Sequence, residues 1–195
     1  MLFRSDFVTF ASAYHLYQNS EYDGLWILLG FLGCSYMYLA KYRKEKIGDT
    51  MLELVQSMKV VLATSFSFYL KAHKYHWNVE GPNFSEYHKF LGDLYEEVQD
   101  SIDATAEHIR ALGEYSPGSY AEFHAFSKIS DETGVPVARS MFDNLLSDNQ
   151  KMIDALNDAF AKAQEANKQG LMNYLADRLD IHAKHGWMLR SITKA

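Results

Sequence analysis

Two stretches with the apolar periodicity of α-helices, joined by a short turn, constrain the fold of this chain more than any other feature. From Leu91 to Leu112, apolar residues recur every three or four positions, the repeat of one helix face. The same spacing runs upstream from Val55 to His76, and a Gly-Pro-Asn turn at residues 81–83 separates the two stretches. Because so short a connection places successive helices side by side and antiparallel, the sequence predicts a helical hairpin.

The hairpin carries four side chains of the kind that bind transition metals, namely His76, His88, Asp103 and Glu107. His76 lies near the end of the first expected helix and His88 near the start of the second, so the turn brings their imidazoles together. Asp103 and Glu107 are four residues apart and share a helix face. Two imidazoles with two carboxylates suit iron, manganese or zinc. All four residues are therefore candidate metal ligands and catalytic residues.

The spacing along the second helix restricts how these ligands combine. His88 and Asp103 are fifteen residues apart, which is about 22 Å at about 1.5 Å per residue. They cannot bind one metal within a single subunit. Either the chain holds two half-sites, or a second, antiparallel copy brings its Asp103 and Glu107 to the histidines of the first. A two-fold axis would build such a shared site twice.

The segments that carry these residues, HWNVEGPNF at 76–84 and IDATAEHIRALG at 102–113, resemble the Dps family of mini-ferritins. The resemblance runs from about residue 54 to the C-terminus and includes EANKQGLMNYLADRLDIHAKHGWMLRS at 165–191. It implies an all-α, ferritin-like four-helix bundle that assembles into a hollow homododecamer. It also implies that the protein oxidises Fe(II) with hydrogen peroxide or dioxygen, stores the ferric mineral and protects against iron and peroxide stress. The four candidate ligands would form the ferroxidase site at a dimer interface.

The chain departs from the Dps pattern at one position. The family usually carries a carboxylate four residues after the second histidine, where this chain has Gly92. Asp93 lies about 140° away around the helix and is a poor substitute. We therefore expect a site one ligand short, with water in that place or weaker binding of one iron.

Four helices and a crossover are expected in residues 51–195. The periodicity predicts helices at about 51–79, 84–112, 136–167 and 171–192. The connection at 114–135 contains AEFHAFSKI, which fits the short helix that Dps-like proteins place there. A connection of this length between long antiparallel pairs indicates a crossover along the bundle.

Residues 1–50 form a predicted N-terminal extension. An uncharged, mostly apolar run from Leu25 to Ala40, extended by Gly24, barely reaches the length of a membrane span and is followed by KYRKEK. Three interpretations remain open: a membrane anchor through residues 24–40, a helix packed on the protein or on a neighbouring subunit, and a misassigned start. The third interpretation stays open because Met51, a possible start residue, lies where the resemblance begins.

Charge and cysteine content narrow the functional classes. The net charge of −6 falls wholly on residues 51–195, because residues 1–50 hold equal numbers of acidic and basic groups. An acidic body disfavours general adhesion to nucleic acid. The single cysteine, Cys34, excludes an intrachain disulfide framework and favours a reducing, cytoplasmic setting. The alternative functions are a DNA-binding, nucleoid-protecting particle and a membrane-tethered structural assembly with a degraded metal site.

Other polar and aromatic residues receive secondary predictions. We expect Trp77 to pack beside the metal site. For His73, on the buried face of the first helix, two interpretations remain open: ordinary packing, and a hydrogen-bonding partner that orients the ligand imidazoles. His182 and His185 are expected to be packing or surface groups. The Glu96-Glu97 pair is expected on a solvated or cavity-facing surface.

Overall fold

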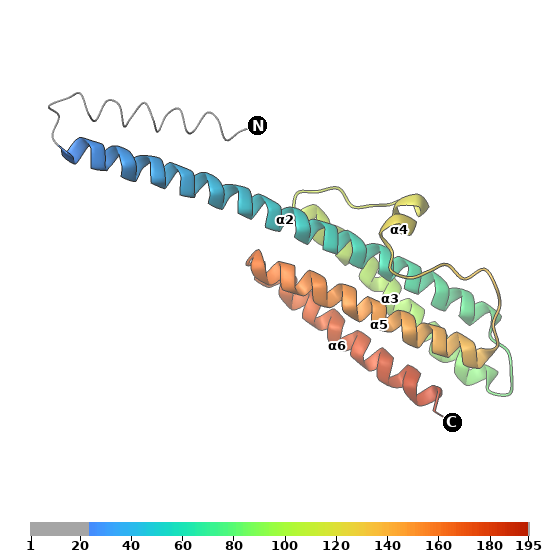
Figure 1. The fold of residues 1–195 in the computed structure, drawn as a ribbon. Coiled ribbons are helices and arrows are strands. Elements are labelled where there is room, and N and C mark those ends of the chain that lie inside the picture. Colours follow the sequence, from blue (N-terminus) through green and yellow to red (C-terminus); the bar gives the residue numbers. More distant parts are fainter. Residues whose placement is uncertain (1–23, 195) are drawn as a thin grey trace. The chain divides into compact units, whose positions relative to one another are not determined.

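The computed structural model describes residues 24–194, with the exception of the side chains of residues 24–36, 38, 44 and 45. The described residues form α2 (Gly24–Asn78), α3 (Phe84–Ala111), α4 (Tyr120–Phe126), α5 (Ala138–Glu165) and α6 (Gln169–Ile192) (Figure 1). No strand occurs in this part of the chain, which confirms the all-α prediction. The chain divides into two units, Met1–Ile47 and Gly48–Ala195, and the second holds the helical bundle.

The N-terminal part of the prediction needs one correction. α2 begins at Gly24, well before the expected start at residue 51. The sequence from 24 to 51 contains no proline, and a lone glycine such as Gly48 costs a helix only about 1 kcal/mol relative to alanine. Residues 1–23 of the predicted extension lie outside the described residues. Most of the predicted anchor at residues 24–40 lies outside the residues whose side chains are described. Among the described residues, no helix is long and apolar enough to cross a membrane.

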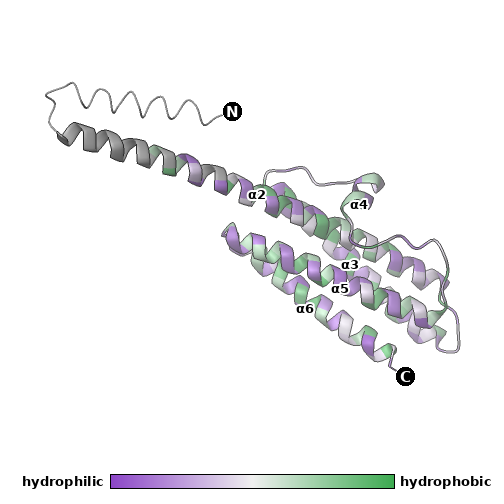
Figure 2. Cartoon of the chain, viewed as in Figure 1, coloured by the Kyte–Doolittle hydropathy of each residue, from purple (hydrophilic) through white to green (hydrophobic). Residues whose placement is uncertain are grey.

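Two apolar clusters form the core of the bundle, and their membership fixes the helix directions. The first contains the Leu54–Leu62 part of α2, the C-terminal Ile109 of α3 and the later residues of α5 from Met152 onward. The second contains the later part of α2 around Phe68 and the early parts of α3 and α5. α2 is therefore antiparallel to both α3 and α5, whereas α3 and α5 are parallel. Figure 2 shows hydrophobic and hydrophilic residues interleaved along these helices.

Because α3 and α5 are parallel, the chain between them must return along the length of the bundle. This long crossover is the one predicted for a ferritin-like fold, and it carries α4 outside the long helices (Figure 1). Ser119 and Glu122 form a capping box at the start of α4. Phe123 of α4 stacks on Phe66 of α2 with ring centroids 4.4 Å apart, which holds the crossover against the bundle.

A buried polar layer lies between the two apolar clusters, near the middle of α3, α5 and α6. Arg178 of α6 forms a two-pronged ion pair with Glu97 of α3. The ring of His182, which is fully buried, lies with Nδ1 2.8 Å from Asn149 Oδ1. Asp148 of α5, 3% exposed, accepts a hydrogen bond from Lys71 Nζ at 2.5 Å. The bundle therefore has a charged and hydrogen-bonded centre between apolar ends.

This layer accounts for the positions of Glu97, His182 and His185. Glu97 does not belong to a solvated surface, since it is half-buried and pairs with Arg178. His182 and His185 are packing groups, one of the two predicted alternatives, because their side chains lie inside the bundle and are 0% and 5% exposed. Glu96, by contrast, is exposed as expected.

Candidate metal centre

The turn between α2 and α3 brings His76 and His88 into direct contact. Gly81 in this turn has a φ of +126°, a left-handed conformation that glycine adopts without strain. The two imidazole rings stack with centroids 3.7 Å apart and planes inclined by 22°. Both side chains are half-buried. The sequence prediction that the hairpin pairs these residues agrees with this geometry.

Each imidazole is held by the backbone of the other residue. His76 Nδ1 lies 2.8 Å from the carbonyl oxygen of His88, and His88 Nδ1 lies 2.9 Å from the carbonyl oxygen of His76. A carbonyl oxygen only accepts hydrogen bonds, so both Nδ1 atoms must carry the proton. In the neutral rings the lone pair is then on Nε2. Such bonds fix tautomer and ring orientation in metal-binding histidines. The pair is therefore prepared to offer two Nε2 ligands.

The His76 ring packs beside Gly92, the position where the family usually carries a carboxylate. A Cβ atom on Gly92, which is buried in α3, would lie 3.3 Å from His76 Cε1 and 3.4 Å from its Nδ1. The 3.3 Å contact is tighter than most Cβ contacts, so with a side chain at position 92 the ring would have to move by a few tenths of an ångström. The absence of a side chain lets His76 pack closely against α3. Glycine at position 92 therefore lacks the carboxylate expected from the family, and it also leaves room for the His76 ring of the stacked pair.

Asp103 and Glu107 lie on α3 beyond the reach of the histidines. α3 is continuous from Phe84 to Ala111. At about 1.5 Å per residue, the backbones of His88 and Asp103 are therefore about 22 Å apart along the helix. Both carboxylates are exposed, and neither forms a hydrogen bond or ion pair with another described residue. No cluster of three or more potential metal ligands occurs within the described part of this single chain. The four predicted ligands thus form two separate pairs.

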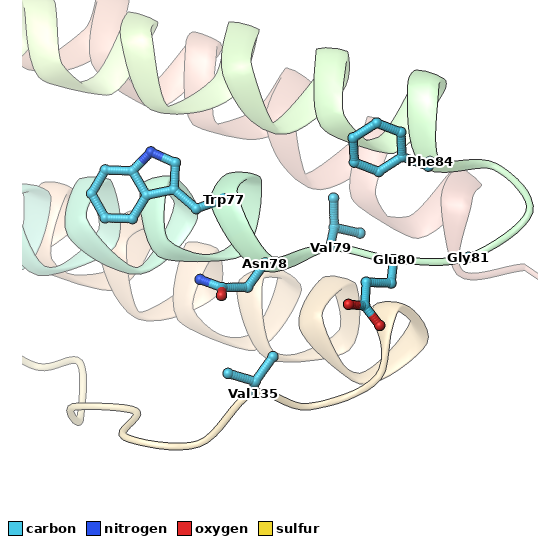
Figure 3. Close-up of a pocket in the computed structure, with 7 residues that line it drawn as sticks. All are labelled: Trp77, Asn78, Val79, Glu80, Gly81, Phe84 and Val135. Carbon is cyan, nitrogen blue, oxygen red and sulfur yellow. The ribbon is translucent and has the colours of Figure 1, made fainter.

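Aromatic side chains surround the histidine pair. Phe84 stacks on His88 with centroids 5.1 Å apart. Trp77, 63% exposed, joins Phe84 and Val135 around a surface pocket of about 490 Å³ beside the site (Figure 3). The expected place of Trp77 near the site is thus observed.

His73 also lies among these aromatic side chains and forms no hydrogen bond to the side chain of either candidate ligand, His76 or His88. Its ring lies between Trp77 and Tyr95, each 4.0 Å away by centroid, and its Nδ1 is 3.3 Å from Tyr69 Oη. Burial, followed by the neighbouring His76, lowers the pKa of His73. Tyr95, in contact with His73 and His76, was not predicted from the sequence. Its position seven residues after His88 on α3, two helical turns along, is the signal that indicates the shared face.

Comparisons with known proteins identify the family. The ferritin-like domain family matches residues 57–195. An uncharacterized low-temperature-induced protein of Nostoc sp. is 36% identical over 132 residues, which cover 67% of this chain and 74% of the relative. A DNA protection during starvation protein of Brevibacillus brevis is 34% identical over 127 residues, covering 63% and 83%.

The solved structures agree. The crystal structure of a Dps protein from Vibrio cholerae, described as a member of a broad superfamily of ferritin-like diiron-carboxylate proteins, is 25% identical and has a TM-score of 0.72. The match covers 75% of this chain and 92% of that one. Together, the parallel α3 and α5 with their crossover, the extent of the domain match and these relatives show that the chain belongs to the Dps family of ferritin-like proteins.

Proposed function

We propose that this protein is a ferroxidase that binds and oxidises Fe(II) at a site shared between two copies of the chain. His76 and His88 of one subunit supply two imidazole ligands, and Asp103 and Glu107 of the partner subunit supply two carboxylates. The resemblance to diiron-carboxylate proteins supports iron as the substrate. The observation that carries the proposal is the reciprocal pair of Nδ1–carbonyl hydrogen bonds, which leaves Nε2 of both histidines available.

The carboxylates support a shared site because of what they lack within their own chain. Asp103 and Glu107 are exposed, one helical turn apart and without an ion-pair partner among the described residues. A two-fold axis across α3 would place each carboxylate pair against the histidine pair of the other chain. Burial of two carboxylates at such an interface requires a counter-charge, which bound Fe(II) provides.

Gly92 sets the number of iron ions that the site holds firmly. Four protein ligands remain, and the fifth that a second iron would need is absent, because Gly92 has no side chain and the His76 ring lies where a Cβ would meet it. The site therefore binds one Fe(II) per histidine pair with high affinity and a second one weakly. Anaerobic titration with Fe(II), monitored by isothermal calorimetry, should show one strong binding event per subunit.

The chemistry is an electron transfer from iron to a bound oxidant. Hydrogen peroxide accepts two electrons and two protons and leaves as two water molecules, while each Fe(II) loses one electron. The imidazole and carboxylate ligands hold the iron in a fixed position where the oxidant can bind to it. The Fe(III) product then passes to an acidic inner surface of an assembled shell, for which the family resemblance suggests twelve subunits. Native mass spectrometry would determine that number.

Stopped-flow oxidation tests the function directly. Protein loaded anaerobically with Fe(II) should show fast formation of Fe(III) on addition of peroxide. The His76→Ala/Asp103→Ala variant should lose the fast phase. A matched control, His124→Ala/Asp180→Ala, removes the same residue types from exposed positions on α4 and α6 and should keep it. Equal rates in wild type and the first variant would refute the proposal.

A further inference from the structure

The N-terminal part of α2 exposes large apolar side chains on more than one face. Met37, Leu39 and Tyr42 are 73%, 60% and 59% exposed. At about 100° per residue, these three positions span about 200° of the helix circumference. A helix that packs on a protein core presents an apolar stripe only about 100° wide. A single packing partner would therefore leave some of these side chains in water.

The sequence extends this apolar character towards the start of the helix. No charged residue occurs from Leu25 to Ala40, and the backbone stays helical from Gly24 onward. The apolar clusters of the bundle begin only at Leu54. A helix that is uncharged on all sides is buried in a large core or in lipid. Lipid is the environment that covers every side of such a helix at once.

A basic segment follows directly after the uncharged run. Residues 41–46 hold four basic groups and one acidic group, whereas residues 51–195 carry the net charge of −6. Lys41 and Arg43 are exposed, and neither forms a hydrogen bond or ion pair with another described residue. Cations next to an apolar segment match the phosphates of anionic lipid headgroups. Nucleic acid would match the cations, but it offers no hydrocarbon for the apolar side chains.

We propose that residues 25–46 of α2 attach this protein to an anionic lipid bilayer. The apolar side chains of residues 25–40 lie among the acyl chains, and the basic groups of residues 41–46 contact the headgroup phosphates. The sixteen residues of the uncharged run cover about 24 Å at about 1.5 Å per residue, less than the hydrocarbon thickness of about 30 Å. The segment is therefore an attachment site, and the proposal does not require it to span the bilayer.

Flotation of vesicles in a density gradient tests the attachment on the full chain, because aggregated protein sinks while vesicle-bound protein rises. The probes are vesicles of phosphatidylcholine mixed with phosphatidylglycerol and vesicles of phosphatidylcholine alone. Wild type should float with the anionic vesicles, and high salt or neutral vesicles should reduce the bound fraction. Each basic group near an anionic surface contributes about fivefold to binding. Lys41→Gln/Arg43→Gln/Lys44→Gln should therefore weaken binding by at least about tenfold.

The matched control for charge is Lys168→Gln/Lys184→Gln/Lys194→Gln. It removes the same net charge from exposed positions on and beside α6, and it should bind vesicles as wild type does. The apolar contribution is tested by Leu39→Asp, which should weaken binding by about tenfold because a carboxylate is costly among acyl chains. Its control is Leu52→Asp, since Leu52 lies on the same helix and is 57% exposed. That variant should keep wild-type binding.

Two outcomes would overturn the attachment to lipid. The first is wild-type protein that floats with neither kind of vesicle. The second is equal binding by wild type, Leu39→Asp and the Lys41/Arg43/Lys44 variant. If instead Leu39→Asp lowers the number of subunits seen by native mass spectrometry without vesicles, the apolar segment binds another copy of the chain, and the lipid proposal fails. None of these outcomes alters the proposed ferroxidase function, since no candidate ligand is changed.

Discussion

Acid should destabilise this protein through the buried histidines of its polar layer. The pKa of His185 is lowered from 6.5 to about 4. Burial is the largest cause; Glu97 raises the pKa by a smaller amount, and Arg178 lowers it. Burial also places the pKa of His182 well below its usual value. Nδ1 of His185 has no hydrogen-bond partner in the described chain, so protonation there finds no acceptor.

The sign of the effect follows from where each state binds protons. Above about pH 6.5 both histidines are neutral in the folded and unfolded chain, and they contribute no pH dependence. As the pH falls from 6.5 toward 4, the unfolded chain takes up protons that folded His185 refuses, so stability falls. The difference between the two pKa values of His185 corresponds to about 3 kcal/mol, since one pH unit is worth about 1.4 kcal/mol. His182 acts in the same direction.

Urea unfolding at fixed protein concentration, measured at pH 7.5 and at pH steps down to about 4.5, provides the assay. His185→Gln removes one titrating group, so the loss of unfolding free energy on acidification should be smaller than in wild type, by about 2–3 kcal/mol over this range. The subtraction cancels the carboxylates, which both proteins share. Identical pH profiles for the two proteins would refute the assignment of a low pKa to buried His185.

Further predictions concern the core, the ion pair and the glycine at the site. Leu156→Ala in the first apolar cluster should lower the unfolding free energy by about 2–5 kcal/mol, measured by urea titration, whereas Leu70→Ala, 41% exposed, should have a much smaller effect. Arg178→Met leaves Glu97 without its partner and should cost up to about 3–5 kcal/mol, less if water reaches the half-buried carboxylate; an unchanged midpoint would contradict this. Gly92→Ala should displace the His76 ring and weaken anaerobic Fe(II) binding without unfolding α3; unchanged affinity would show that the ring yields at no cost.

The sequence predicted the regular part of the fold well, because helical periodicity depends on local spacing. The second and fourth helices were expected at 84–112 and 171–192 and are observed at Phe84–Ala111 and Gln169–Ile192. Gly113, with a φ of +96°, accounts for the end of α3. The start of α2 was not predicted, because a tolerated Gly48 and the resemblance that begins near Met51 suggested a boundary where the helix continues.

The polar layer and the surroundings of the site could not be predicted, because they depend on how separate helices align. Arg178 and Glu97 lie far apart in the sequence, and their pairing follows from the register of α6 against α3. The sequence likewise shows that Gly92 removes a ligand, but not that the His76 ring packs on the vacated position. The pairing of His76 with His88 was accessible, because a short turn fixes that contact locally.

The central claim is that each metal site takes its imidazoles from one chain and its carboxylates from another, and subunit mixing tests it most directly. His76→Ala/His88→Ala and Asp103→Ala/Glu107→Ala variants are each expected to be inactive in Fe(II) oxidation. Co-assembled in equal amounts from unfolded chains, they should recover about a quarter of the wild-type sites, because half of the two-fold pairs are mixed and each mixed pair has one intact site. A mixture that stays as inactive as its components, although native mass spectrometry shows mixed pairs, would contradict the shared site.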